Sequence, residues 1–170
     1  MELTFRQAIP EDTEEIWNIL QQAIILRREQ GSDQWQDGYP NLEVIRSDVE
    51  KRSGHVLLDE EKVIGYVAIL INDEPQYARI EGAWLSDDDF VVLHRVAISQ
   101  SYLGRGLAKV IMRFVEDFAL KNNIYSIKGD TNFDNNAMMR TFESVGYVYC
   151  GEVYFRGSAR RAYEKLLVGD

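Results

Sequence analysis

The sequence predicts a single α/β domain that spans residues 1–170, and three observations lead to this prediction. A chain of 170 residues is long enough to bury one hydrophobic core and too short for two comfortable ones. Its 45% hydrophobic and 28% charged residues are ordinary for a globular protein and exclude a disordered or fibrous chain. Segments with strand-like alternation and segments with helical spacing follow one another along the chain.

The N-terminal part predicts a strand, two helices and a hairpin, in that order. Residues 3–9 (LTFRQAI) alternate like a half-buried strand, and Asp12 opens a segment whose apolar residues follow helical spacing. Asn41 follows a loop rich in turn formers and is a suitable cap for a second, short helix. Two apolar runs at 55–59 and 62–72 flank a short turn, which predicts an antiparallel hairpin.

The C-terminal part predicts strands that alternate with helices and then two final strands. A polar loop over 73–88 leads into the long apolar strand 90–99, and apolar residues three and four apart predict a helix from Leu107. The remaining elements are a strand at 125–132, a helix at 135–145 that Gly146 ends, and strands at 147–155 and 161–168.

The formal charge of -9 at pH 7 limits the expected partners. It repels phosphate backbones, which disfavours general nucleic-acid binding, and it attracts cations, including amines. The lone Cys150 has no second cysteine for a disulfide or a thiolate zinc cluster, so we expect a buried strand residue and no metal site. No apolar run approaches the ~20 residues of a membrane span, and the first residues lack a secretion signal. We expect a soluble, cytoplasmic protein.

Two glycines, Gly104 and Gly106, lie between the strand 90–99 and the helix that begins at Leu107. A helix that follows a strand in this way points several free amide N–H groups at one spot, which suits an anion such as a phosphate. Glycine lets the backbone approach a ligand closely and adopt positive φ. A tight turn without any ligand would use the same two glycines.

Two well-known phosphate loops can be compared with this spacing. A Walker loop requires Gly-Lys followed by Ser or Thr, which is absent here. A dinucleotide fingerprint requires a third glycine where Lys109 stands, although Asp130 at the end of the next strand is near the right distance for a ribose partner. A dinucleotide-binding enzyme therefore remains an alternative.

The stretch Ser101-Tyr102-Leu103-Gly104-Arg105-Gly106 resembles the acetyl-CoA loop of the GNAT acetyltransferase superfamily, which reads Arg or Gln, two residues, Gly, one residue, then Gly or Ala. A second stretch from Asn135 to Tyr147 is similar to the family's Asn-x-x-small helix that ends in Gly-Phe or Gly-Tyr. The order of elements agrees over nearly the whole chain. The resemblance implies a mixed, mostly antiparallel central sheet of about seven strands, with helices on both faces and a splay between the fourth and fifth strands.

The resemblance also implies acetyl-CoA as the acetyl donor and indicates which residues would lie beside it. The backbone N–H groups of residues 103–108 would hold the pyrophosphate, helped by the helix dipole. An amide near Val96 or Ala97 would stabilise the oxyanion that forms when the thioester is attacked. The implied cofactor-binding residues are Val96, Ala97, Ile98, Leu103, Gly104, Arg105, Gly106, Leu107, Ala108, Asn135 and Phe142.

Two positions depart from the family's pattern, and a third allows a second role. Ser101 stands where the family prefers Arg or Gln, a side chain that is often dispensable if amides bind the ligand. Phe142 occupies the position of a tyrosine that in many members protonates the departing thiolate, and phenylalanine cannot donate a proton. Because a thiol of pKa ~8.5 is a tolerable leaving group, water or another tyrosine could be the acid. Asn135 is equally suited to cap its own helix.

Attack on the thioester requires a neutral amine, so we expect a general base or a water relay. His94 is the first candidate, because strand alternation would place it on the same face as Val96 and Ile98. A histidine in this strand could instead be hydrogen-bonded within the sheet. Glu81 is the second candidate, since the family often places a carboxylate near this point.

The acceptor pocket is expected from the variable loops, which are unusually aromatic in this chain. Rings in loops can cage a cation or stack on a planar group, or they can cover the end of the sheet. With the negative charge and the acidic run 87–89 they favour a small cationic amine, although such a run alone is usually solvated surface. The candidate acceptor residues are Trp35, Tyr39, Tyr77 and Trp84.

The leading hypothesis is an N-acetyltransferase that moves the acetyl group of acetyl-CoA to a primary amine of a small molecule or peptide by direct attack. A non-catalytic acyl-CoA-binding module, motivated by Phe142, and the dinucleotide-binding enzyme are the alternatives. We expect no nucleic-acid or membrane partner. The sequence is compatible with a homodimer and does not identify the acceptor.

Overall fold

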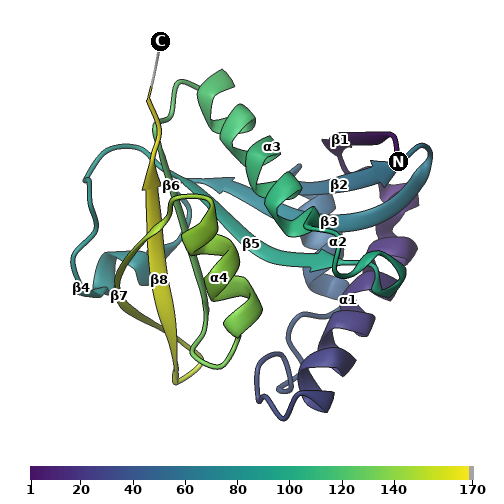
Figure 1. Cartoon of the computed structure of the whole chain (residues 1–170), viewed down its shortest axis with the longest axis horizontal. Helices are drawn as coiled ribbons and strands as arrows, with labels where there is room; N and C mark the ends of the chain where they lie inside the picture. The colour runs from purple at the N-terminus through teal and green to yellow at the C-terminus, as the bar shows by residue number, and fades with distance from the viewer. Residues whose placement is uncertain (169–170) are drawn as a thin grey trace. The chain divides into compact units, whose positions relative to one another are not determined.

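The computed structural model describes residues 1–168, which form eight strands and four α-helices (Figure 1). The strands are β1 (Leu3–Gln7), β2 (Gly54–Asp59), β3 (Lys62–Ile71), β4 (Glu81–Gly82), β5 (Val91–Ile98), β6 (Ser126–Asn132), β7 (Val148–Phe155) and β8 (Ser158–Leu166). The helices are α1 (Thr13–Glu29), α2 (Leu42–Glu50), α3 (Leu107–Lys121) and α4 (Asn136–Ser144), with 3-10 turns at Pro10–Asp12, Pro75–Arg79 and Gln100–Tyr102. In this described part, no helix combines the length and apolar character that a membrane crossing requires.

The contacts divide the chain into two compact units. Unit 1 comprises Met1–Ile69 and Arg95–Ile111, and unit 2 comprises Leu70–His94 and the chain from Met112 onward. The prediction of a single domain over residues 1–170 stays a prediction.

In unit 1 the strands β1, β2 and β3 form an antiparallel sheet, with the second half of β5 beside β3. Asn41 caps α2 as predicted, because its side chain accepts a hydrogen bond from Val44 N at 3.0 Å. Apolar side chains of α1, α2 and the strands pack into one core. Its buried members are Ala8, Ile16, Ile19, Leu20, Ile45, Val56, Leu58, Val63, Tyr66 and Ala97.

In unit 2 the strand order is β5-β6-β8-β7-β4, and among its described strand pairs only β5 and β6 are parallel. The described parallel register joins Val91 to Ile127 and Val92 to Lys128. Because most pairs are antiparallel, the predicted mixed, mostly antiparallel sheet is confirmed. Beyond this short pairing the two strands were predicted to splay apart. That splay involves residues of different units and stays a prediction.

The strand β4 was not predicted, because two residues are too few to show an alternating pattern. It pairs with β7 inside the region predicted as a polar loop, and it makes the number of strands eight rather than about seven. The two backbones approach each other closely at Gly82 and Gly151. A Cβ on Gly82 would lie 2.2 Å from the carbonyl oxygen of Cys150, and a Cβ on Gly151 would lie 2.2 Å from that of Glu81.

The core of unit 2 includes a stack of aromatic rings beneath α4. The Phe142 ring is fully buried and lies 4.7 Å from the Tyr163 ring, centre to centre, at an interplanar angle of 11°. Gly129 of β6 leaves room for this ring, since a Cβ there would lie 2.9 Å from Phe142 Cζ. Phe142 is therefore a core residue that fixes the position of α4 on the sheet.

Gly129→Ala is expected to lower the free energy of unfolding by about 1–3 kcal/mol, because the new Cβ would overlap the Phe142 ring. Urea unfolding measures this loss. Phe142→Leu opens space beside Gly129. The double variant should therefore lose less unfolding free energy than the sum of the losses in the two single variants. Strictly additive losses in this double-mutant cycle would contradict the described packing.

Candidate functional site

In unit 1, β5 leads through a 3-10 turn and a glycine loop into α3. Gly104 and Gly106 both have left-handed φ, 78° and 72°, and a Cβ on either would meet nothing within 4 Å. The backbone conformation therefore favours glycine here, and the space beside the loop is open. The turn is anchored to α1, because Gln100 N donates to Gln22 Oε1 at 2.8 Å.

Positive charge gathers around an aromatic ring at this loop. The Arg105 guanidinium lies 4.9 Å and the Lys62 Nζ 5.3 Å from the centre of the Tyr102 ring, and Tyr102 Oη donates to Asp59 at 2.9 Å. Residues 103–106 are exposed and the Leu107 side chain is buried. A helix N-terminus with nearby cations is suited to bind an anion.

Two side chains of the segment Val96-Ala97-Ile98 in β5 pack inside unit 1. Ala97 belongs to the core of unit 1, and Ile98 Cδ1 would lie 3.2 Å from a Cβ on Gly65. At Ala97 and Ile98, what this segment can offer to a ligand is therefore its main chain.

The backbone of β5 is irregular at Arg95, whose φ is 58°. A left-handed φ is uncommon for a residue with a long side chain and interrupts the alternation of a strand. The prediction that His94 shares a face with Val96 and Ile98 assumed unbroken alternation, and that assumption is wrong.

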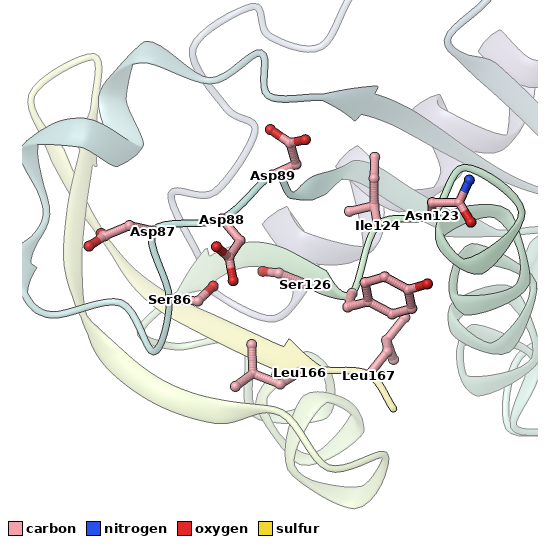
Figure 2. Close-up of a pocket in the computed structure, with 10 residues that line it drawn as sticks. Ser86, Asp87, Asp88, Asp89, Asn123, Ile124, Ser126, Leu166 and Leu167 are labelled. Atoms are coloured by element: carbon pink, nitrogen blue, oxygen red, sulfur yellow. The ribbon is translucent and has the colours of Figure 1, made fainter. Parts of the chain in front are cut away.

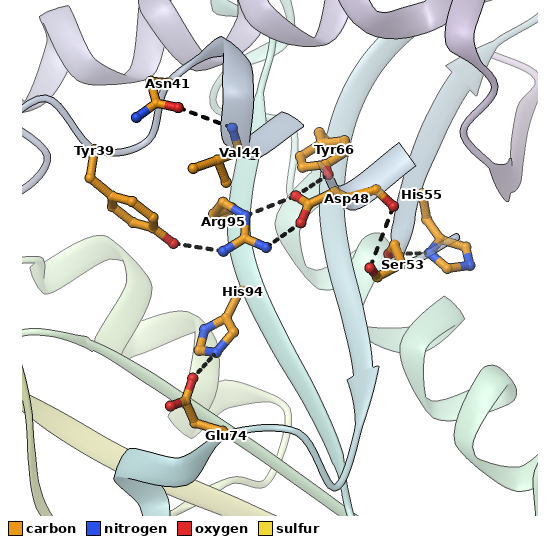
Figure 3. Close-up of polar contacts among 10 residues, drawn as sticks. All are labelled: Tyr39, Asn41, Val44, Asp48, Ser53, His55, Tyr66, Glu74, His94 and Arg95. Atoms are coloured by element: carbon orange, nitrogen blue, oxygen red, sulfur yellow. Dashed lines mark hydrogen bonds and ion pairs between the residues drawn. The ribbon is translucent and has the colours of Figure 1, made fainter. Parts of the chain in front are cut away.

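The Arg95 side chain is the centre of a buried polar cluster in unit 1 (Figure 3). Its Nε and Nη2 donate to the two carboxylate oxygens of Asp48 at 3.0 and 2.6 Å, and its Nη1 donates to Tyr39 Oη at 2.6 Å. Tyr66 Oη also donates to Asp48, at 2.6 Å. Burial opposes the charge of Arg95, but Tyr39 and Asp48 outweigh it, so the pKa of the guanidinium is raised above its ordinary value.

In unit 2, His94 lies between the carboxyl groups of Glu74 and Asp130, and Figure 3 shows its contact with Glu74. His94 Nε2 is 2.8 Å from Glu74 Oε2, and Nδ1 is 3.9 Å from Asp130 Oδ2. An ionised carboxylate only accepts hydrogen bonds, so contact with Glu74 places the proton on Nε2 and leaves the lone pair of a neutral ring on Nδ1. The side chains of His94 and Glu74 are 16% and 12% exposed, so the pair is largely shielded from water.

Asp130 is held by aromatic residues rather than free for a ligand. Tyr77 Oη donates to Asp130 Oδ2 at 2.6 Å, and the Tyr77 ring centre lies 6.1 Å from that of His94. Burial raises the pKa of the Asp130 carboxyl above its ordinary value, although His94, Tyr77 and Arg160 oppose that rise. The ribose role considered for Asp130 does not fit a buried, hydrogen-bonded carboxyl.

The predicted acceptor residues fall into different surroundings. In unit 1, Trp35 packs against the core and Tyr39 is half-buried. In unit 2, Tyr77 is buried, and its ring centre lies 5.0 Å from that of Trp84. Trp84 also carries the Lys128 Nζ 4.5 Å above its ring, so one side of that ring is already occupied by a cation.

Three further predicted residues have defined structural contacts. Glu81 is exposed on β4 and accepts a hydrogen bond from Tyr154 at 2.9 Å, and the described contacts do not bring it to His94. Asn135 caps α4 by accepting from Met138 N at 3.1 Å. Phe142, implied as a neighbour of the cofactor, has its ring buried in the core of unit 2.

An acidic pocket of about 600 Å³ lies in unit 2 near the end of β8 (Figure 2). Asp87, Asp88 and Asp89 line it, and their side chains point in different directions rather than converging. Across residues 1–168, no group of three or more His, Cys, Asp or Glu side chains is arranged to hold a metal. These three aspartates are exposed, so the acidic run is solvated surface.

Sequence reasoning missed the partners of the polar residues in β5. Glu74 and Asp48 are distant from His94 and Arg95 in the chain, and only the fold brings each pair together. One signal was present: two polar residues within the apolar run FVVLHRVAIS must find partners if the strand is buried.

Comparison with known proteins identifies similar chains. A family model described as the Acetyltransferase (GNAT) family matches residues 14–147. YesJ of Bacillus subtilis, an uncharacterized N-acetyltransferase, is 27% identical over 151 residues, covering 85% of this chain and 81% of YesJ. The structure of a GNAT-family acetyltransferase from Streptococcus agalactiae is 32% identical, with a TM-score of 0.89 over 98% of this chain and 96% of that one. Salmonella typhimurium yncA, solved with its cofactor acetyl-CoA, has a TM-score of 0.70 at 18% identity, over 99% and 95% of the two chains.

The free energy of unfolding of Asp130→Asn, relative to that of the wild type, is expected to increase as the pH rises above 3.8 towards the raised pKa of Asp130. In that window the native wild type binds more protons than the unfolded chain, so its stability falls with rising pH, whereas the amide does not titrate. Each unit by which the pKa is raised corresponds to about 1.4 kcal/mol. Urea unfolding of both proteins from pH 4 to 8 measures the difference, and a constant offset would contradict the perturbed carboxyl.

Proposed function

Because the chain belongs to the acetyltransferase (GNAT) family, we propose that it transfers the acetyl group of acetyl-CoA to a primary amine of a small molecule or peptide. The predictions of this family and of an acetyltransferase are confirmed by the match to residues 14–147. Acetyl-CoA as the donor agrees with its presence in a protein of the same fold. The observation that carries the proposal is the open loop with two left-handed glycines before α3.

The loop would bind the pyrophosphate through its backbone. Amide N–H groups of residues 103–108 precede and begin α3, where the helix dipole favours negative charge. Exposed Arg105 adds a cation, and Ser101 contributes no charge of its own. Without a Cβ, the two glycines leave the surface of the loop open for a phosphate to approach the amides.

Acyl transfer would proceed by direct attack of the amine on the thioester carbonyl. A main-chain amide near Val96 or Ala97 would donate to the developing oxyanion. As the tetrahedral intermediate collapses, the carbon–sulfur bond breaks and the thiolate leaves. Phe142 cannot protonate it, so water or another acid would supply that proton.

His94 would act as the general base, directly or through a water molecule. Its contact with Glu74 leaves Nδ1 as the proton acceptor of the neutral ring. Glu81, the second candidate, already accepts a hydrogen bond from Tyr154 and is exposed on β4. These contacts favour His94 over Glu81.

The acceptor is proposed to meet Trp35 and Tyr39, which are half-buried on the loop before α2. Tyr77 is buried and supports Asp130, and the Trp84 ring already lies beneath the Lys128 ammonium. A cationic amine, a cytoplasmic location and a homodimer remain predictions from the sequence.

Calorimetric titration with acetyl-CoA, followed by a thiol-release assay with polyamines, amino acids, aminoglycosides and peptides, tests the proposal. Binding with turnover supports it and identifies the acceptor class. Binding without turnover would favour a non-catalytic acyl-CoA-binding module, and absence of binding would contradict the assignment of the loop.

Gly104→Val is expected to weaken acetyl-CoA binding at least about tenfold, because a β-branched side chain at this left-handed position distorts the loop and fills its open side. Calorimetry measures the affinity. Gly157→Val is the matched control, since Gly157 has a φ of 76° with equally open surroundings but lies in the turn between β7 and β8. Equal affinities in the two variants would contradict the loop assignment.

His94→Ala is expected to lower turnover by about 10²–10⁴-fold with little change in acetyl-CoA affinity, because it removes a general base and leaves the loop intact. The rise of turnover with pH should flatten in the variant. Initial rates from pH 6 to 9 with the best acceptor of the panel test this. A preserved pH profile would assign the base to Glu81 or to water.

A further inference from the structure

The conformation of Arg95 is unusual for a strand residue and is held by an unusual number of partners. Its φ of 58° lies in the left-handed region, which a long side chain avoids unless its surroundings enforce it. Three of its guanidinium nitrogens donate to described partners, two to Asp48 and one to Tyr39. Side-chain exposure is 10% for Arg95 and 8% for Asp48, so this pair is shielded from competing water.

The partners of Arg95 are themselves fixed by neighbouring elements of unit 1. Asp48 belongs to α2 and also accepts from Tyr66 of β3, whose ring is fully buried. A Cβ on Gly54 would lie 2.9 Å from Tyr66 Oη, so β2 confines that hydroxyl as well. A side chain clamped by such rigid neighbours can hold a strained backbone in place.

The backbone of Arg95 determines the direction of the next peptide group. Its dihedral angles set the plane that carries the amide N–H of Val96, the first residue of the segment proposed to face the thioester. We propose that Arg95, clamped by Asp48 and Tyr39, is a positioning residue that directs the Val96 amide towards the oxyanion. This inference rests on the acetyl-transfer function proposed above, adds Arg95 and Asp48 to it, and gives Tyr39 a second role.

A second ion pair in the same unit supplies a comparison. Arg6 donates from both terminal nitrogens to the two oxygens of Asp12, at 2.7 and 3.0 Å. The Asp12 side chain is 9% exposed, close to the value for Asp48, but Arg6 lies in β1 and is not among the residues with positive φ. Loss of this pair should therefore affect stability alone.

The test is the ¹³C resonance of acetyl-CoA labelled at the thioester carbonyl, recorded free and bound to the whole chain. A hydrogen bond from an amide polarises the carbonyl and moves its resonance downfield, which needs no acceptor and reports on the oxyanion donor directly. The variants are Asp48→Asn and Tyr39→Phe, with Asp12→Asn as the matched control. Tyr39→Phe removes one hydroxyl only, so it keeps the test decisive if Asp48→Asn fails to fold.

The wild type and Asp12→Asn are expected to show the same downfield shift on binding. Asp48→Asn should lose about half of that shift or more, and Tyr39→Phe a smaller part, with acetyl-CoA affinity unchanged within about threefold because the loop amides are intact. An unchanged shift in every variant that folds would overturn the role of Arg95.

The failure of the two proposals is distinguishable in the same experiment. If the wild type does not bind acetyl-CoA, the proposed function fails and the inference fails with it. The wild type could instead bind acetyl-CoA while the carbonyl resonance stays at the free position. In that case the acetyl-CoA loop stands, but the hydrogen bond from the Val96 amide and the positioning role of Arg95 are overturned.

Discussion

The need to pair polar side chains inside an apolar strand governs the surroundings of β5. His94 and Arg95 follow one another in this strand, and their side chains are only 16% and 10% exposed. A shielded polar or charged side chain is tolerated when hydrogen-bonding partners replace the lost water. In unit 1 this requirement is met by Asp48 of α2, and in unit 2 by Glu74, which precedes the 3-10 turn Pro75–Arg79. Electrostatic pairing, added to apolar packing, fixes the elements on which the proposed chemistry depends.

Features encoded by a few neighbouring residues could be predicted from the sequence. Asn41 caps α2, the hairpin between β2 and β3 turns after Asp59, and Gly146 follows the last turn of α4 with a φ of 94°. The loop around Gly104 belongs to the same class, because left-handed glycines before a helix form a local signal. Local hydrogen bonds and dihedral preferences decide these features, so no knowledge of distant contacts was required.

Features decided by contacts between residues far apart in the chain could not be predicted from the sequence. The irregular backbone at Arg95 depends on Asp48, which lies far away in the chain, and it breaks the alternation on which the placement of His94 relied. Phe142 was considered beside the cofactor, yet its ring fills the space that Gly129 leaves open in the core. Strand β4 had too few residues to produce a pattern. In each case the deciding partner comes from another element.

The short strand β4 has a consequence for the behaviour of the protein at high concentration. In unit 2 it pairs with Gly151 and Glu152 of β7, a strand whose Val148, Tyr149 and Tyr154 side chains are exposed. An uncovered strand of this composition would be a template for pairing with other molecules, whereas β4 replaces it with a two-residue edge that carries Glu81. Gly82 and Gly151 permit this cover, because a side chain on either would collide with the opposing backbone. These two glycines therefore allow the sheet to end in a short edge strand, a role separate from acetyl transfer.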